Sequence, residues 1–357
     1  MQTLSDFYQS IFGCKTYKIS LDAGCTCPNR DGSKGTGGCV FCSENGSGDF
    51  VAARALSVRE QLEQGRALVE AKLRGRSGER KGKYIAYFQN FTSTYGNVKA
   101  LLEKYRQALE CENVAGIAVA TRPDCLGDEI LRGLADISRE HFVQMELGLQ
   151  TCNETTGRFI NRCYTNQDYI DAVRRIREAA PNIHIVTHLI FGLPGETEED
   201  MLNSVRFVVN CNGKMVVEPV ETTIMSCSGS TNLSCSDSTN LSCSGSANLS
   251  CSGLTRTSLP PFGIKITSLY VLKNTRLAQL YEAGQYQPLT KEAYFGILQK
   301  ALPLLPESCV IHRLTGDPPK RLLIAPSWPA DKKRLLNEIR TLILPISHRF
   351  ILPLDFT

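Results

Sequence analysis

The chain has 357 residues, of which 42% are hydrophobic and 21% are charged, a composition typical of a globular protein with one barrel-sized core or two smaller domains. It contains no run of about eighteen apolar residues and no charged-then-apolar leader, so the sequence supports neither a membrane span nor a secretion signal. Fifteen cysteines in such a chain fit a reducing cytoplasm, where thiolates can bind a metal centre, better than a disulfide framework.

Hydrophobic periodicity predicts a short amphipathic helix in residues 1–14 and then strands that alternate with helices. The expected strands are 17–21, 84–88, 115–120, 142–149, 184–191 and 264–269. The expected helices between them are 57–73, 98–109, 127–137, 153–160, 169–179 and 196–209. This alternation favours a parallel sheet with right-handed crossovers. Six units suffice for an α/β fold of the partial (β/α)6 TIM-barrel type, in which the chemistry lies at the C-terminal ends of the strands.

Residues 212–262 interrupt the barrel, which we expect to span 15–271. A serine-rich octapeptide that begins at Cys227 recurs from Cys235 and Cys243, and the segment has too few apolar residues for a core. We therefore expect a disordered insertion.

A small α/β extension is expected over 272–343, followed by a tail over 344–357 that has no clear period. Residues 300–357 contain nine Lys and Arg against five Asp and Glu. This excess of positive charge equals the net charge of the whole chain, +4. This basic extension is either a nucleic-acid surface or a solvated helix face.

The loop after the first expected strand carries Cys27, Cys39 and Cys42 with a C-x11-C-x2-C spacing. Its glycines allow the tight curvature that brings three thiolates together. A thiolate-only set suits iron–sulfur clusters or zinc, and structural zinc needs a fourth ligand that does not stand at a matching spacing. Three thiolates on a four-iron cluster leave one iron open, as radical S-adenosylmethionine (SAM) chemistry requires. Three ordinary cysteines are the alternative.

Polar residues also end four of the later strands, at 89–95, 121–124, 150–151 and 192–197. Glu146, if it points into the barrel, requires a partner, which the amino or ribose groups of a cofactor could supply. The Gly-Leu-Pro-Gly turn that begins at Gly192 allows either close packing of strand on helix or backbone contact with an adenine ring. His184 and His188 lie on one strand face, as core histidines or as substrate contacts.

Five motifs stand in a recognisable order: Cys-Pro-Asn-Arg-Asp-Gly with Gly-Gly-Cys-Val-Phe-Cys, Tyr-Phe-Gln-Asn-Phe-Thr-Ser-Thr-Tyr, Glu-Leu-Gly-Leu-Gln-Thr, His-Leu-Ile-Phe-Gly-Leu-Pro-Gly-Glu and His-Arg-Leu-Thr-Gly-Asp. Over 13–211 and 262–342, the chain resembles the YhcC/YtqA-type radical SAM proteins, which belong to the group that includes the elongator catalytic subunit. The resemblance implies a [4Fe–4S] cluster on Cys27, Cys39 and Cys42, with SAM on the unique iron. It also implies cofactor contacts by Gln89, Asn90, Glu146, Gln150, Ile190, Gly192 and Glu196.

The activity that follows from this resemblance is reductive cleavage of SAM, with an external electron donor, to methionine and a 5′-deoxyadenosyl radical that abstracts hydrogen from a substrate. Some of the family is linked to the tRNA wobble uridine, where a carboxymethylaminomethyl group becomes an aminomethyl group. The sequence also leaves open a small-molecule substrate, or a non-enzymatic nucleic-acid-binding protein with a structural zinc site.

The chain departs from the family pattern at four places. Cys25 stands where the family has another residue, and it is a conceivable competing ligand. The residues Asn161-Arg162-Cys163-Tyr164 replace Asn-Arg-Gly-His. The serine-rich repeats are foreign to the family, and the C-terminus is atypical.

Overall fold

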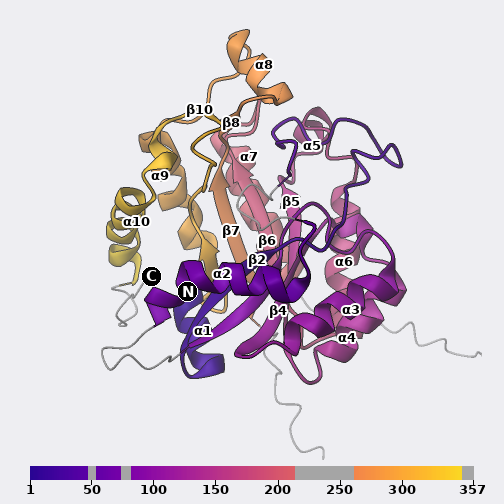
Figure 1. The fold of residues 1–357 in the computed structure, drawn as a ribbon. Coiled ribbons are helices and arrows are strands. Elements are labelled where there is room, and N and C mark those ends of the chain that lie inside the picture. The colour runs from indigo at the N-terminus through magenta and orange to yellow at the C-terminus, as the bar shows by residue number, and fades with distance from the viewer. Residues whose placement is uncertain (47–53, 74–81, 214–260, 348–357) are drawn as a thin grey trace, which may run out of the picture. The chain divides into compact units, whose positions relative to one another are not determined.

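The computed structural model describes residues 1–46, 54–73, 82–213 and 261–347 (Figure 1). Most of the insertion predicted over 212–262, namely 214–260, lies outside these residues, whereas Asn212 belongs to a helix and Phe262 to the core. An eight-stranded sheet, in the order β1-β9-β7-β6-β5-β4-β3-β2, organises the described chain, and every neighbouring pair in it is parallel. Its strands are β1 (Gln2–Thr3), β2 (Lys15–Leu21), β3 (Gly82–Phe88), β4 (Val114–Thr121), β5 (Phe142–Gln150), β6 (His184–Phe191), β7 (Gly263–Ser268) and β9 (Val310–Arg313).

The helices are α1 (Leu4–Phe12), α2 (Val58–Leu73), α3 (Val98–Leu109), α4 (Asp128–Ile137), α5 (Glu154–Phe159), α6 (Asn166–Ala179), α7 (Glu198–Gly213), α8 (Arg276–Glu282), α9 (Lys291–Ala301) and α10 (Lys332–Ser347). Short 3-10 turns occur at Pro123–Cys125, Leu302–Leu304 and Trp328–Ala330, and β8 (Val271–Leu272) pairs with β10 (Leu323–Ala325) in an antiparallel ribbon. None of the described helices is long and apolar enough to cross a membrane.

The α/β half-barrel predicted from the sequence is confirmed, and the six predicted strands correspond to β2 through β7. The sheet continues beyond residue 271, the predicted end of the barrel, because β9 pairs with β7 and β1 pairs with β9. The segment between β7 and β9 contains α9, so this pair forms one more parallel crossover unit. The predicted extension therefore contributes a strand to the barrel.

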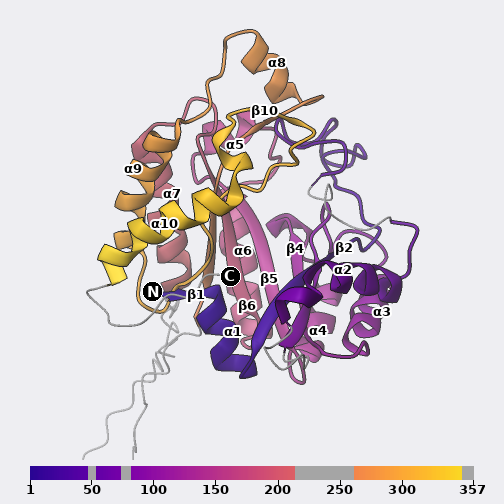
Figure 2. The ribbon, with the colours of Figure 1, turned by 60° about the vertical axis from the view of Figure 1, so that its left-hand side comes forward.

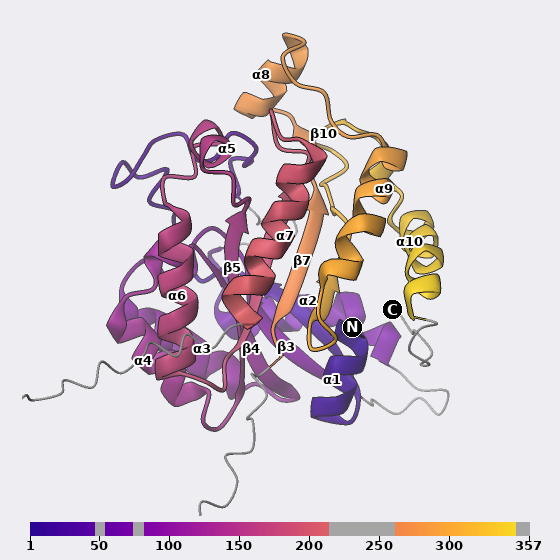
Figure 3. The same ribbon diagram turned by 180° about the vertical axis from the view of Figure 1, so that it is seen from behind.

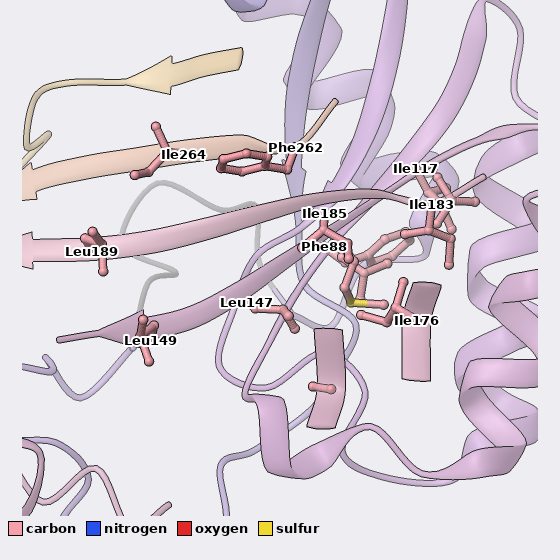
Figure 4. Packing of buried hydrophobic residues seen from close by; sticks show 14 of the residues in the cluster. Phe88, Ile117, Leu147, Leu149, Ile176, Ile183, Ile185, Leu189, Phe262 and Ile264 are labelled. Atoms are coloured by element: carbon pink, nitrogen blue, oxygen red, sulfur yellow. The ribbon is translucent and has the colours of Figure 1, made fainter. Parts of the chain in front are cut away.

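The main hydrophobic core lies between the sheet and the helices on its outer face. Figure 3 shows α6, α7 and α9 running across the strands on that face. Alternation along the strands supplies this layer, as at Leu147 and Leu149 of β5, which pack in one cluster with Ile176 of α6 (Figure 4). The intervening residue Gly148 and its neighbour Glu146 instead line the inner face.

The inner face of the curled sheet is closed at one end by α1, which lies at the N-terminal ends of the strands (Figure 2). Phe7 and Tyr8 of α1 pack with inward residues of three strands, namely Ile85 of β3, Ala118 of β4 and Val310 of β9. The Tyr8 hydroxyl donates to Gln144 Oε1 at 3.1 Å. Side chains therefore fill the N-terminal end of the barrel lumen.

Candidate functional site

A pocket of about 380 Å³ opens at the C-terminal ends of the strands. Its lining comes from the cysteine loop and from strands β2 through β7 and β9. Because α1 fills the opposite end of the lumen, the pocket is the mouth of a blind cavity. The strand-end location agrees with the expectation from the sequence.

Cys27, Cys39 and Cys42 all line this pocket. The Cys42 amide donates to the Cys39 carbonyl at 3.0 Å, and Gly38, with a φ of 77°, makes the left-handed turn just before Cys39. The thiol of Cys39 donates to Cys42, and this bond with the nearby Arg30 guanidinium lowers the pKa of Cys42 to about 7 despite burial. The same hydrogen bond and burial raise the pKa of Cys39, so of these two thiols Cys42 is the one favoured as a thiolate.

The donor set fits an iron–sulfur cluster. Within the part of the chain that the structure describes, no three His, Cys, Asp or Glu side chains are placed as ligands of a single metal ion would be. A four-iron cluster is wider than one ion, and each of its cysteines binds a different iron atom. Cys27, Cys39 and Cys42, which line one pocket, would be able to hold such a cluster through three of its irons.

Cys25, the competing ligand considered from the sequence, belongs to the hydrophobic core. It is buried among the residues of the main cluster and does not line the pocket. Burial, followed by the charge of Asp22, raises the pKa of its thiol to about 11. Cys25 therefore does not supply a fourth ligand.

A second loop holds the cysteine loop in place. The Asn29 amide donates to the Asn161 carbonyl at 2.6 Å, and the Asn161 amide donates to the Gly38 carbonyl at 2.8 Å. Arg162, only 1% exposed, donates to the carbonyls of Leu149 at 3.1 Å and Thr151 at 2.6 Å. These bonds tie the end of β5 to the cysteine loop.

The two unusual residues of this second loop lie at the site. Cys163 has a φ of 58°, in the left-handed region that favours the glycine of the family pattern. The Tyr164 hydroxyl is within hydrogen-bonding distance of the Gly148 carbonyl and, at 2.6 Å, of Gln150 Oε1. The guanidinium groups of Arg122 and Arg162 each lie 4.8 Å from the centroid of its ring. Tyr164 itself lines the pocket, so it orients a predicted cofactor contact.

The seven predicted cofactor contacts fall into two groups. Gln89, Glu146, Gln150 and Ile190 line the pocket together with the cysteines. The structure does not bring the other three into the lining: Asn90 donates to Asp22 Oδ2 at 2.7 Å, Gly192 accepts from the Tyr286 hydroxyl at 2.9 Å, and Glu196 bonds to Thr151.

Glu196 nevertheless retains bonding capacity. Its Oε2 is buried without a hydrogen-bond partner among the described residues. Burial raises its pKa to about 7, against the hydrogen bond from Thr151.

The protein itself provides the partners of Glu146 that we had expected from a cofactor. Its Oε1 accepts from Lys18 at 2.8 Å and from the Gln144 amide at 2.6 Å. Its Oε2 accepts from the Tyr87 hydroxyl at 2.5 Å and from the Lys265 ammonium. Burial opposes the charged form, but the two lysines hold the pKa of Glu146 well below its ordinary value. Sequence reasoning missed both lysines, although Lys265 breaks an apolar strand at an inward position.

The two histidines of β6 have different surroundings. The His184 Nε2 lies 2.8 Å from His312 Nε2, and its ring packs 4.4 Å from the Phe7 ring at the closed end of the lumen. His188 lines the pocket and lies 3.1 Å, through Nε2, from Thr267 Oγ1. His184 is thus a core histidine, and His188 faces the cavity.

Arg122 and Arg313 also line the pocket and were not predicted as site residues. Arg122 forms a bidentate ion pair with Asp124 within the predicted polar cluster after β4. Its Nε donates to Oδ1 at 2.9 Å and its Nη2 donates to Oδ2 at 2.8 Å. Lys34 of the cysteine loop reaches the same carboxylate at 2.5 Å. The cluster after β4 therefore anchors the cysteine loop from a second side.

Comparison with known proteins agrees with this arrangement. Residues 32–208 match the model of the radical SAM superfamily, and residues 261–343 match the model of the radical SAM C-terminal domain. The chain is 33% identical over 337 residues to the uncharacterized protein YtqA of Bacillus subtilis (strain 168), covering 94% of this chain and 87% of that protein. It is 30% identical over 318 residues to protein YhcC of Escherichia coli (strain K12), and this match covers 89% of this chain and 84% of YhcC.

Among solved structures, the fold is similar to that of Elp3 from the archaeon Methanocaldococcus infernus, with a TM-score of 0.55 at 13% identity. That likeness covers 92% of this chain and 63% of the Elp3 chain, and at this identity it concerns the fold alone. The resemblance inferred from the motifs is confirmed by the sequence matches. The chain therefore belongs to the radical SAM superfamily, in the group of YtqA and YhcC, and is an enzyme of the class that uses a [4Fe–4S] cluster and SAM.

Proposed function

We propose that Cys27, Cys39 and Cys42 hold the [4Fe–4S] cluster of this enzyme and that SAM and the substrate bind in the pocket beneath it. The observation that carries this proposal is the shared lining: the three thiols and four of the seven predicted cofactor contacts face one blind cavity at the C-terminal ends of the strands. When bound, the cluster and SAM supply a one-electron cleavage that yields methionine and a radical able to take hydrogen from a substrate.

The residues of the chain position and shield this chemistry. Asn29, Asn161 and Lys34 fix the cysteine loop against the ends of β4 and β5. Tyr164 holds the Gln150 side chain, which lets that amide present a fixed face to the cofactor. Phe7 and Tyr8 fill the N-terminal end of the lumen and so block access to the pocket from that end. No side chain is assigned as a catalytic acid or base.

For the substrate we propose the wobble uridine of tRNA, whose carboxymethylaminomethyl group would become an aminomethyl group. Support comes from the family resemblance and from the basic C-terminal part of the chain. Lys332 at the start of α10 pairs at 2.6 Å with Asp317, which lines the pocket, so that basic helix begins beside the pocket rim. A basic surface next to the mouth suits a phosphate backbone. The reaction also needs an external electron donor, and we expect it to occur in the cytoplasm.

The substrate proposal is tested by anaerobic incubation of the reconstituted enzyme with SAM, a strong reductant and tRNA that carries carboxymethylaminomethyluridine. Mass spectrometry of the digested tRNA should show loss of that nucleoside and gain of aminomethyluridine. Binding of tRNA should weaken steeply with salt. SAM cleavage without any change in the tRNA and without salt-dependent binding would point to a small-molecule substrate instead.

A further inference from the structure

We propose that the floor of the pocket is an anion site, in which Arg313 and Lys265 bind a carboxylate of the substrate. The inference deepens the proposed function, since it rests on the substrate entering this pocket. It assigns a positioning role to two cations on β9 and β7, far from the cysteine loop in the strand order.

The lumen carries more positive than negative charge. The Glu146 carboxylate is the acceptor for two ammonium groups, Lys18 and Lys265, and both of its oxygens also accept a bond from a neutral donor. The other carboxylate in the pocket lining, Asp317, is paired with Lys332. Among the described residues, no carboxylate remains to balance Arg313. Arg313 is exposed and lines the pocket, so its guanidinium is accessible to an anionic ligand.

A backbone irregularity directs Arg313 into the cavity. The register between β7 and β9 shifts between Ile264 and Lys265, so that Lys265 pairs with Arg313 while Ile264 pairs with Ile311. The bulge allows consecutive residues to face inward: His312 contacts His184, and Arg313 lines the pocket. Lys265 and Arg313 are therefore directly opposed on one face of the sheet. Two like charges in that arrangement repel each other, and because Glu146 already pairs with Lys265, Arg313 is the cation left to bind a second anion.

The pKa of Lys265 depends first on its burial and only then on the charges around it. Burial lowers it to about 7, against the effect of Glu146 and with that of Lys18 and Arg313. The neighbouring His188 contributes no positive charge at neutral pH, because burial and then Lys265 lower its pKa to about 4. An anion on the floor would restore the proton of Lys265 and give it an ionic partner.

The chemistry of Arg313 favours a carboxylate. A guanidinium group presents two parallel N–H donors that match the two oxygens of a carboxylate or of a phosphate. The carboxymethylaminomethyl side chain ends in a carboxylate, and its capture on the floor would hold the adjacent methylene groups in the lumen. The carboxylate of SAM and a nucleotide phosphate are the competing occupants, and both are outcomes of the test.

The test compares binding of two nucleosides, 5-carboxymethylaminomethyluridine and 5-aminomethyluridine, to the reconstituted holoenzyme by anaerobic calorimetry. The wild type should bind the acidic nucleoside about tenfold more tightly, because one bond to a charged group is at stake. Arg313→Gln should abolish this preference, and Arg313→Lys should keep part of it. Arg174→Gln is the matched control, since Arg174 is an exposed arginine paired with Glu178 on α6. Equal affinities in the wild type, or a preference that survives in Arg313→Gln, would overturn the proposal.

A second measurement separates this proposal from that of the tRNA substrate. If neither nucleoside binds, the uridine assignment fails, and the floor is tested by thermal unfolding in acetate, inorganic phosphate and acetamide at matched ionic strength. Acetate should raise the Tm of the wild type but not that of Arg313→Gln, because a ligand of the folded state stabilises it. Stabilisation equal to that by acetamide, stronger stabilisation by phosphate, or loss of the acetate effect when SAM is added would contradict a substrate carboxylate site.

Discussion

The Nζ of Lys18 lies 2.8 Å from Oε1 of Glu146, although β3 and β4 separate their strands in the sheet. Lys265 reaches the same carboxylate from the other side, across β6. One side chain can be reached from both directions only because the sheet curls around it. The three residues thus join the two halves of the lumen in one network.

Substitution of Glu146 by Gln should lower the free energy of unfolding by about 3–5 kcal/mol, because it leaves two buried ammonium groups without a counter-charge. Lys265→Met in the Glu146→Gln background should recover part of that loss. Urea unfolding of the two single variants and the double variant measures the coupling. Additive effects would mean that Lys265 and Glu146 do not interact.

Arg162→Ala should destabilise the protein by about 3 kcal/mol or more, because it leaves the buried carbonyls of Leu149 and Thr151 without their donor. Arg158→Ala is the control, since Arg158 is an exposed arginine one turn earlier whose hydrogen bond within the described chain goes to Thr155 at 3.2 Å. Its effect should be within about 0.5 kcal/mol. Equal losses in the two variants would show that Arg162 does not support the loop.

Cys163 offers a test of backbone strain beside the cysteine loop. Cys163→Gly should keep or raise the stability, because glycine adopts a φ of 58° without a steric penalty. Cys163→Val should lower the free energy of unfolding by about 1–2 kcal/mol, since a β-branched residue tolerates that conformation least. The two variants are compared by chemical denaturation. A valine variant as stable as the glycine variant would contradict the strain argument.

The strands, the cysteine loop and its place in the barrel could be predicted because each depends on local pattern: alternation in β3 to β7, and glycines with three thiols after β2. The arrangement of side chains inside the lumen could not be predicted from the sequence. Along the chain, Glu146 lies more than a hundred residues from both Lys18 and Lys265. No local signal specifies that the two lysines bind its carboxylate. The inward orientation of Arg313 depends on a register shift between β7 and β9, which periodicity does not encode.

Neighbours in sequence can also mislead. Asn90 follows Gln89 directly, yet the chain turns after β3, and only Gln89 lines the pocket. Cys25 and Cys27 are two residues apart, but one belongs to the core and the other to the pocket. Residue type was sufficient to propose both cysteines as ligands, and only the tertiary packing separates them.

Glu196 should make stability depend on pH. Its pKa of about 7 exceeds its ordinary value of 4.5, so between these values the folded state keeps a proton that the unfolded state has lost. Stability should therefore fall as the pH rises through this window, by about 1–2 kcal/mol relative to Glu196→Gln. Unfolding at pH 4.5 and pH 7.5 without SAM, on the wild type and this variant, provides the comparison. Parallel pH profiles would contradict the shift.

The most direct test of the central claim is the yield of 5′-deoxyadenosine from SAM after anaerobic reconstitution with iron and sulfide. Iron content is measured in the same samples. The wild type and Cys25→Ala should bind about four irons per chain and form the product. Cys27→Ala, Cys39→Ala and Cys42→Ala should lose both while remaining folded by circular dichroism. A folded Cys42→Ala variant that retains the cluster and the activity, or a wild type that binds zinc and forms no product, would contradict the account.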